Sequence, residues 1–284
     1  MRRSPHLKHL SVTDTESFTP SLQRPVRVRA RSMPTDTHFE PHAHAWSQLA
    51  YCASGIVQVT AAQRRPGDTN TLANDEITYI VPPSRAVWIA PGARHHITVL
   101  EAAEFRTLYI DASATPALWQ GCRVMMVSPL LREAIAALDT LPVQPPLVLR
   151  EQLLSALVLD EITRASTVAL GVPLPHPQSG DKRLRALCEA VLRSPAEHAT
   201  LADWATDRGA SERTMARLFR DELGLSFQQW RQQAVLAHAL PLLARGAPVS
   251  AVAAATGYAS DSAFSAMFKA AMGQSPTHFQ AKRR

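Results

Sequence analysis

The sequence predicts an α+β chain of two domains, a jelly-roll β-barrel with flanking helices followed by an all-helical domain. Three observations lead to this fold class. Short apolar runs punctuated by Gly and Pro fill residues 25–112, and after about residue 125 the apolar spacing changes to the three-and-four period of helices. A proline-rich segment, residues 171–180, then separates two regions. With 284 residues, 46% of them hydrophobic, the chain can bury two cores.

The net charge of +6 is unevenly distributed. From residue 181 onward there are 14 Lys and Arg against 9 Asp and Glu, so +5 of the total lies in the helical region. Such an excess is typical of a surface that neutralises phosphates, although a basic surface without a nucleic-acid partner would give the same count. The three scattered cysteines, Cys52, Cys122 and Cys188, argue against a disulfide framework. They favour a cytoplasmic location.

No stretch of about 18 uncharged apolar residues occurs, so no membrane partner is expected. Residues 1–24 lack periodicity and predict a mobile tail. Residues 25–112 contain the short strand-like runs RPVRVRARSM, SQLAYCAS, GIVQVTAA, EITYIVPP and AVWIAPG. Because no helix signal separates these runs, they predict a barrel rather than alternating strands and helices.

Residues 113–170 predict two amphipathic helices, over 130–138 and 149–162, separated by a break at 142–146. Their apolar faces need a cover, which is either a second subunit, giving a homodimer, or the barrel itself. Residues 171–180, with three prolines and two glycines, predict a flexible linker to the helical domain at 181–284.

A first helix-turn-helix is predicted around Gly209. Thr200 caps a helix with Trp204 inward, and Ser211 caps a second helix to about residue 223. Helical spacing directs Met215, Leu218 and Phe219 to the core. The outward positions, which are candidates for contacting DNA, are Glu212, Arg213, Ala216, Arg217 and Arg220.

Arginine can bond guanine O6 and N7 through its planar fork, so Arg213 and Arg217 are the candidates for base readout and Arg220 for a phosphate contact. Each could instead be a solvated charge paired with Asp221 or Glu222. A connecting helix follows over 226–244, interrupted by Pro241. Its length of roughly 28 Å approaches the ~34 Å between successive major-groove openings on one side of DNA.

A second helix-turn-helix is predicted over residues 249–279. Gly257 marks the turn, Ser260 caps the following helix, and Gly273 ends that helix. The outward candidates for contacting DNA are Asp261, Ser262, Ser265, Ala266 and Lys269.

This second unit resembles the signature of the AraC/XylS family of transcription regulators. The resemblance is carried by Tyr258, Ser260, Ser262, Phe264, Phe268, Lys269, Gly273, Ser275, Pro276 and Phe279. It implies a DNA-binding regulator with an operator in double-stranded DNA and RNA polymerase as a candidate partner. Many family members have arginine where this chain has Ala266, so the second recognition helix is expected to read less sequence than the first.

Within the barrel, His42, His44, Gln48 and Gly55 resemble the first cupin motif, and residues 91–95, ending at His95, resemble the second. The cupin-like resemblance implies a sensory domain for a small-molecule effector. It also implies a divalent-metal site at His42, His44 and His95, with Gln48 in place of the usual glutamate and therefore a weaker, neutral ligand. The competing interpretation is a metal-free effector pocket, or histidines that bond buried backbone groups.

Trp46, Tyr51 and Trp88 are candidates for the walls of the effector pocket, with core packing as their alternative role. Arg85 is either an anion anchor or a surface-loop residue. The sequence thus predicts a regulator that is not an enzyme and requires no cofactor other than this candidate metal. Two alternatives are a metal-dependent, dioxygenase-like cupin enzyme with a helical appendage, and a nucleoid-type DNA binder without an effector.

Overall fold

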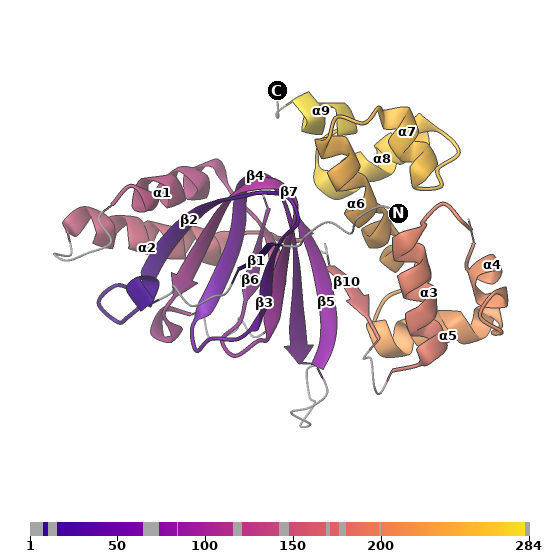
Figure 1. The fold of residues 1–284 in the computed structure, drawn as a ribbon, viewed down its shortest axis with the longest axis horizontal. Coiled ribbons are helices and arrows are strands. Elements are labelled where there is room, and N and C mark those ends of the chain that lie inside the picture. The colour runs from indigo at the N-terminus through magenta and orange to yellow at the C-terminus, as the bar shows by residue number, and fades with distance from the viewer. Residues whose placement is uncertain are drawn as a thin grey trace. The chain divides into compact units, whose positions relative to one another are not determined.

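The computed structural model describes residues 8–10, 16–64, 74–83, 85–115, 121–141, 148–168, 171–175, 180–198 and 200–281. The chain forms two compact units, one of residues 1–63 and 79–170 and one of residues 64–78 and 171–284. Strands dominate the first unit and helices the second (Figure 1).

The first unit is built on a curved, mainly antiparallel sheet. Its strands are β1 (Lys8–Leu10), β2 (Val26–Met33), β3 (Thr37–His42), β4 (Ser47–Arg64), β6 (Arg85–Ile89), β7 (His95–Ile110), β8 (Arg123–Met126) and β9 (Thr167–Val168). The strand β5 (Asn74–Val81) is divided between the units, because residues 74–78 belong to the second. The long strand β7 pairs with β4 on one edge and with β2 and β3 on the other. Beyond β4, the strands β6, β8 and β9 extend the sheet. The predicted β-domain is therefore present, and it continues past residue 112 into β8 and β9.

Gly55 is required where β4 bends. Its φ is +80°, and a Cβ there would lie 2.3 Å from the carbonyl oxygen of Ala102 and 2.4 Å from the Cα of Ala103. The register between β4 and β7 shifts around this point. Only a residue without a side chain allows the two strands to approach so closely.

Two helices, α1 (Pro129–Asp139) and α2 (Leu149–Arg164), pack on one face of the sheet (Figure 1). Leu49, Tyr51 and Trp88 from the sheet are buried in one core with Ile135 of α1 and Val158 of α2. The two predicted helices are confirmed. The predicted break between them, residues 142–146, lies outside the described residues.

The prediction of a mobile tail over residues 1–24 is wrong for its described parts. Lys8–Leu10 forms β1 beside β3, and Glu16–Phe18 forms a 3-10 helix, η1. A Nη2 of Arg24 lies 2.9 Å from a carboxylate oxygen of Glu151 on α2. The sequence pattern missed this ion pair because partners far apart in sequence leave no local period.

In the second unit, the helices are α3 (Lys182–Arg193), α4 (Leu201–Thr206), α5 (Glu212–Leu223), α6 (Phe227–Ala244), α7 (Val249–Ala255), α8 (Asp261–Met272) and α9 (Pro276–Ala281). Trp204, Phe219 and Trp230 are fully buried in the core of its first half. Phe264 and Phe268 are fully buried in the second half. The predicted all-helical domain and its long connecting helix, α6 with Pro241 inside it, are confirmed.

Part of the predicted linker is instead an ordered strand, β10 (Gly171–Leu174). Val172 is 2% exposed in the same core as Trp230, whose indole N–H donates to the carbonyl oxygen of Pro173 at 2.7 Å. Proline and glycine predicted flexibility here, but the buried apolar side chain and the indole hydrogen bond fix the segment. Residues 176–179 of that linker lie outside the described residues.

Candidate functional site

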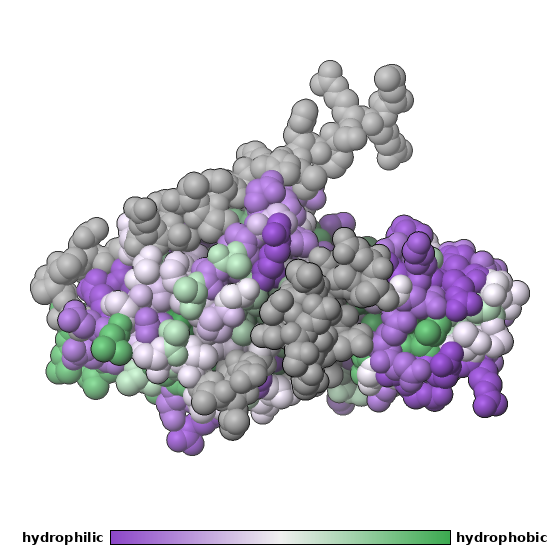
Figure 2. All heavy atoms as spheres, turned by 90° about the horizontal axis from the view of Figure 1, so that it is seen from below, coloured by the Kyte–Doolittle hydropathy of each residue, from purple (hydrophilic) through white to green (hydrophobic). Residues whose placement is uncertain are grey.

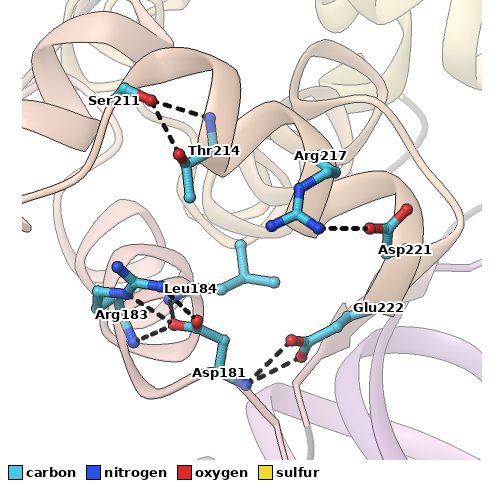
Figure 3. Close-up of polar contacts among 8 residues, drawn as sticks. All are labelled: Asp181, Arg183, Leu184, Ser211, Thr214, Arg217, Asp221 and Glu222. Atoms are coloured by element: carbon cyan, nitrogen blue, oxygen red, sulfur yellow. Dashed lines mark hydrogen bonds and ion pairs between the residues drawn. The ribbon is translucent and has the colours of Figure 1, made fainter.

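The helix-turn-helix of α4 and α5 is held by side-chain caps and a glycine turn. The Thr200 hydroxyl accepts a hydrogen bond from the backbone N–H of Asp203, and Ser211 accepts one from the N–H of Thr214 at 3.2 Å (Figure 3). Gly209 between the helices has a φ of +61°. Met215 and Phe219 are fully buried, as predicted, whereas Leu218 is half-buried. These contacts fix which face of α5 points outward.

That outward face carries the predicted residues. Glu212, Arg213, Arg217 and Arg220 are exposed and Ala216 is half-buried. Arg217 lies 3.8 Å from Asp221, with 66% of its side chain exposed (Figure 3). An exposed ion pair of this kind contributes at most about 0.5 kcal/mol, so it leaves the guanidinium free to exchange partners. The carboxylate of Glu222 is used elsewhere, because it accepts the backbone N–H of Asp181.

The second helix-turn-helix also has a glycine turn and a capped second helix, but α7 begins after Pro248 without a side-chain cap. Gly257 has a φ of +76°, and Ser260 caps α8 by accepting the N–H of Ala263 at 3.2 Å. The outward positions Asp261, Ser262, Ala266 and Lys269 are exposed and Ser265 is half-buried. One cation and one carboxylate lie among these five residues, so α8 offers far less positive charge than α5.

A second cluster, in the β-domain, contains the three predicted histidines. His42 ends β3, His44 follows in the next loop, and His95 begins β7. One ligand nitrogen from each lies within 4.8 Å of the other two. The predicted convergence of these side chains is therefore present in the structure.

The ring orientations follow from backbone contacts. The Nδ1 atoms of His42, His44 and His95 lie 2.8, 2.7 and 2.9 Å from the carbonyl oxygens of Glu40, Trp46 and Ala93. A carbonyl oxygen only accepts hydrogen bonds, so each Nδ1 carries a hydrogen, and Nε2 of a neutral ring then keeps its lone pair. Burial lowers the pKa of His95 to about 3 and also lowers the pKa of His42, which keeps these two rings neutral.

Gln48 lies between the rings. Its Oε1 lies 2.8 Å from Nε2 of His44 and 3.2 Å from Nε2 of His95. An amide oxygen only accepts, and each Nδ1 already faces a carbonyl, so in a neutral ring the Nε2 lone pair and Oε1 of Gln48 face each other. A cation between them would be held by the amide oxygen together with the imidazole nitrogens.

The aromatic neighbours differ from those predicted. Trp46 stacks on His44, with ring centroids 5.1 Å apart and planes 5° apart, as expected for a wall of the site. Trp88 is fully buried and pairs with Leu49, on the face of the sheet opposite Gln48, so its assignment to the effector pocket is wrong. Tyr51 also belongs to that other core.

Tyr109 takes the place expected of Trp88. Its ring lies 5.9 Å from the rings of both His44 and Trp46, and it is opposite Gln48 in the β4–β7 register. Sequence alternation places Tyr109 on one face of β7, but only the register between strands identifies that face as the histidine side. Arg85, considered for a surface loop, is instead 3% exposed in β6, and burial lowers its pKa.

Two family models match the chain. Residues 24–158 match the AraC-like ligand binding domain, and residues 204–282 match a helix-turn-helix domain. The HTH-type transcriptional regulator NimR of Escherichia coli K12 is 34% identical over 258 residues, covering 86% of this chain and 91% of the relative. The arabinose operon regulatory protein of Salmonella typhimurium is 28% identical over 132 residues, 46% of each chain.

Among solved structures, ToxT of Vibrio cholerae is similar at 13% identity and a TM-score of 0.36, covering 90% of this chain and 98% of the other. The described residues contain no helix long and apolar enough to span a membrane. A β-domain that matches the AraC-like ligand binding domain precedes two helix-turn-helix units, and 34% identity to a known regulator extends over nearly the whole chain. The chain therefore belongs to the AraC family of DNA-binding transcription regulators.

Proposed function

We propose that the chain reads its operator mainly through α5, under the control of a small molecule bound at the histidine cluster. The observation that supports the DNA-reading part is the pair of exposed arginines, Arg213 and Arg217, four residues apart on a capped recognition helix. Both guanidinium groups can enter one major groove and bond guanine edges. Arg220 and Lys269 supply phosphate contacts that set orientation without reading sequence.

The test is an in vitro selection of bound duplexes by the full chain, followed by titration of the selected duplex and of a scrambled duplex at fixed salt. A sequence-specific regulator prefers the selected duplex by about 10³-fold or more. A ratio near one would indicate a nucleoid-type binder and would contradict the proposal. Binding to an operator requires access to the DNA of the cell, and we therefore assign the protein to the cytoplasm.

For the effector, the supporting geometry is the cluster of His42, His44, Gln48, His95 and Trp46, joined by Tyr109. A stacked aromatic wall and polar groups that converge on one point are typical of small-molecule sites. The effector regulates only if it binds one state of the protein more tightly than another. The effector would be recognised as a compound that changes the affinity of the protein for its operator and that binds more weakly to a Tyr109→Ala variant.

A divalent metal is a second candidate ligand for the same cluster. Its support is the orientation of the three histidines, whose Nδ1 atoms lie at hydrogen-bond distance from carbonyls and which each bring a ligand nitrogen within 4.8 Å of the other two, an arrangement common around protein-bound zinc. The residues fit such an ion, which would supply a positive centre for an anionic effector. Metal analysis of the purified chain, with a test for oxygenase turnover, also examines the alternative of a cupin enzyme.

We also infer a homodimer formed through the helices of the β-domain. Leu149 and Leu153 lie one turn apart on α2 and are 69% and 62% exposed, and Leu130 on α1 is 50% exposed. Hydrophobic side chains gather at the end of the molecule that carries these helices (Figure 2). Burial against a second copy would remove this surface from water. RNA polymerase is a further candidate partner, which a transcription assay with purified components would test.

A further inference from the structure

Arg231 on α6 contacts both halves of the DNA-binding unit. Its Nη2 lies 3.3 Å from the carbonyl oxygen of Pro195, in the loop after α3, and 3.5 Å from that of Thr256, at the end of α7. Pro195 belongs to the first half and Thr256 to the second. We propose that Arg231 is a positioning residue that fixes the distance and angle between α5 and α8, and therefore the spacing between the two DNA half-sites that one subunit accepts.

The two halves also touch directly beside this guanidinium. A Cβ on Gly257 would lie 3.0 Å from the Cα of Ala196, 3.1 Å from Nη2 of Arg231 and 3.3 Å from the carbonyl oxygen of Pro195. The turn of the second helix-turn-helix is thus packed against the loop between α3 and α4. Glycine is needed at this position for the contact as well as for its positive φ.

The helix α6 by itself does not hold the two halves at a fixed angle. It packs on α3 in the first half and on α7 and α9 in the second, so it joins them as a rod. Pro241, inside α6, cannot donate the backbone hydrogen bond of its turn, and this allows the rod to bend. The planar guanidinium of Arg231 ties the halves together to one side of the rod. Its Nη2 carries two N–H groups and can donate one to each of the two carbonyls, while the planar group keeps both hydrogens in fixed directions.

The test uses the full-length protein and its selected operator, with one base pair added or removed between the half-sites. The variants are Arg231→Met and Gly257→Ala. The matched control is Gly273→Ala, because Gly273 has a similar φ of +73° but nothing within 4 Å of its added Cβ. The wild type and the control are expected to lose about tenfold or more in affinity on a one-base-pair shift. The Arg231→Met and Gly257→Ala variants are expected to lose about threefold or less, since their halves can adjust.

If Arg231→Met keeps the tenfold discrimination, with or without a uniform loss of affinity, the proposal is wrong. If Arg231→Met fails to fold by circular dichroism, the comparison of Gly257→Ala with Gly273→Ala decides the question in the same way. The inference depends on the proposed use of both recognition helices. A wild-type selection that returns a single half-site would contradict this inference and leave the reading of DNA by α5 in place, whereas discrimination retained by the variants would contradict the role of Arg231 alone.

Discussion

Arg217 is the residue from which we expect the largest loss of sequence specificity. It projects from α5 with 66% of its side chain exposed and is held only by a 3.8 Å ion pair with Asp221. Arg217→Ala should weaken binding to the selected operator by about 1 to 3 kcal/mol and relax the preference at one base pair. Arg164→Ala is the matched control, because Arg164 is also exposed and pairs with Asp160 at four-residue spacing. A gel-shift titration in which both variants bind like the wild type would contradict the base-reading role.

Lys269 should behave differently from Arg217, because a phosphate contact has no sequence preference. Lys269→Ala should weaken binding to the operator and to the scrambled duplex by the same factor. It should also reduce by about one the slope of log affinity against log salt concentration.

Replacing Ala266 by glycine should leave the base preference unchanged. Affinities measured at four or five salt concentrations would distinguish a phosphate contact from a base contact.

A substitution at Gln48 tests the proposed cation site of the histidine cluster. Gln48→Glu replaces a neutral amide by a carboxylate among three Nε2 lone pairs, so affinity for Zn²⁺ or Ni²⁺ should rise about tenfold or more. Gln152→Glu on α2 is the control, since Gln152 is exposed and has no part in the cluster. Calorimetric titration of the purified variants measures the change. Equal affinities for the wild type and both variants would argue for a metal-free site.

The helices α1 and α2 carry the prediction for assembly. Leu149→Glu together with Leu153→Glu should convert the proposed dimer to a monomer at micromolar concentration, because two carboxylates would lie in the apolar contact. Leu22→Glu is the control, because Leu22 is 79% exposed but lies outside these helices. Sedimentation or light scattering reports the mass. An unchanged mass for the double variant would place the subunit contact elsewhere.

Elements with a strong local period could be predicted, and those defined by long-range pairing could not. The faces of α5 and α8 follow from spacing alone, because Phe219 and Phe264 fix the inward direction. In the sheet, the alternation of side chains defines two faces, but it does not tell which face packs on the helices and which face carries the histidines. This is why Trp88 was assigned to the wrong face and Tyr109 was missed. The convergence of His42, His44 and His95 was predicted through a family resemblance and not through spacing.

At the scale of the whole chain, the boundary of the DNA-binding unit lies earlier than composition suggests. A fragment of residues 171–284 keeps Val172 in the core and the hydrogen bond from Trp230 to Pro173, whereas a fragment of residues 181–284 loses both. Burial of a valine contributes about 1.5 kcal/mol or more, and an unsatisfied buried indole N–H costs about 1 kcal/mol or more. The shorter fragment should therefore melt about 10 °C lower. Equal melting temperatures by circular dichroism would contradict a structural role for β10.

The outward face of α5 presents Arg213, Arg217 and Arg220, whereas that of α8 presents Lys269 alone among its cations, so a subunit bound to DNA through both would have a polarity. If one end of its footprint is read by arginines and the other by small, nearly neutral side chains, then a single copy can tell one strand of the duplex from the other. Such a protein needs no palindrome to choose an orientation. Its target sites should accordingly show strong base preference at one end, weak preference at the other, and a consistent direction relative to the start of transcription.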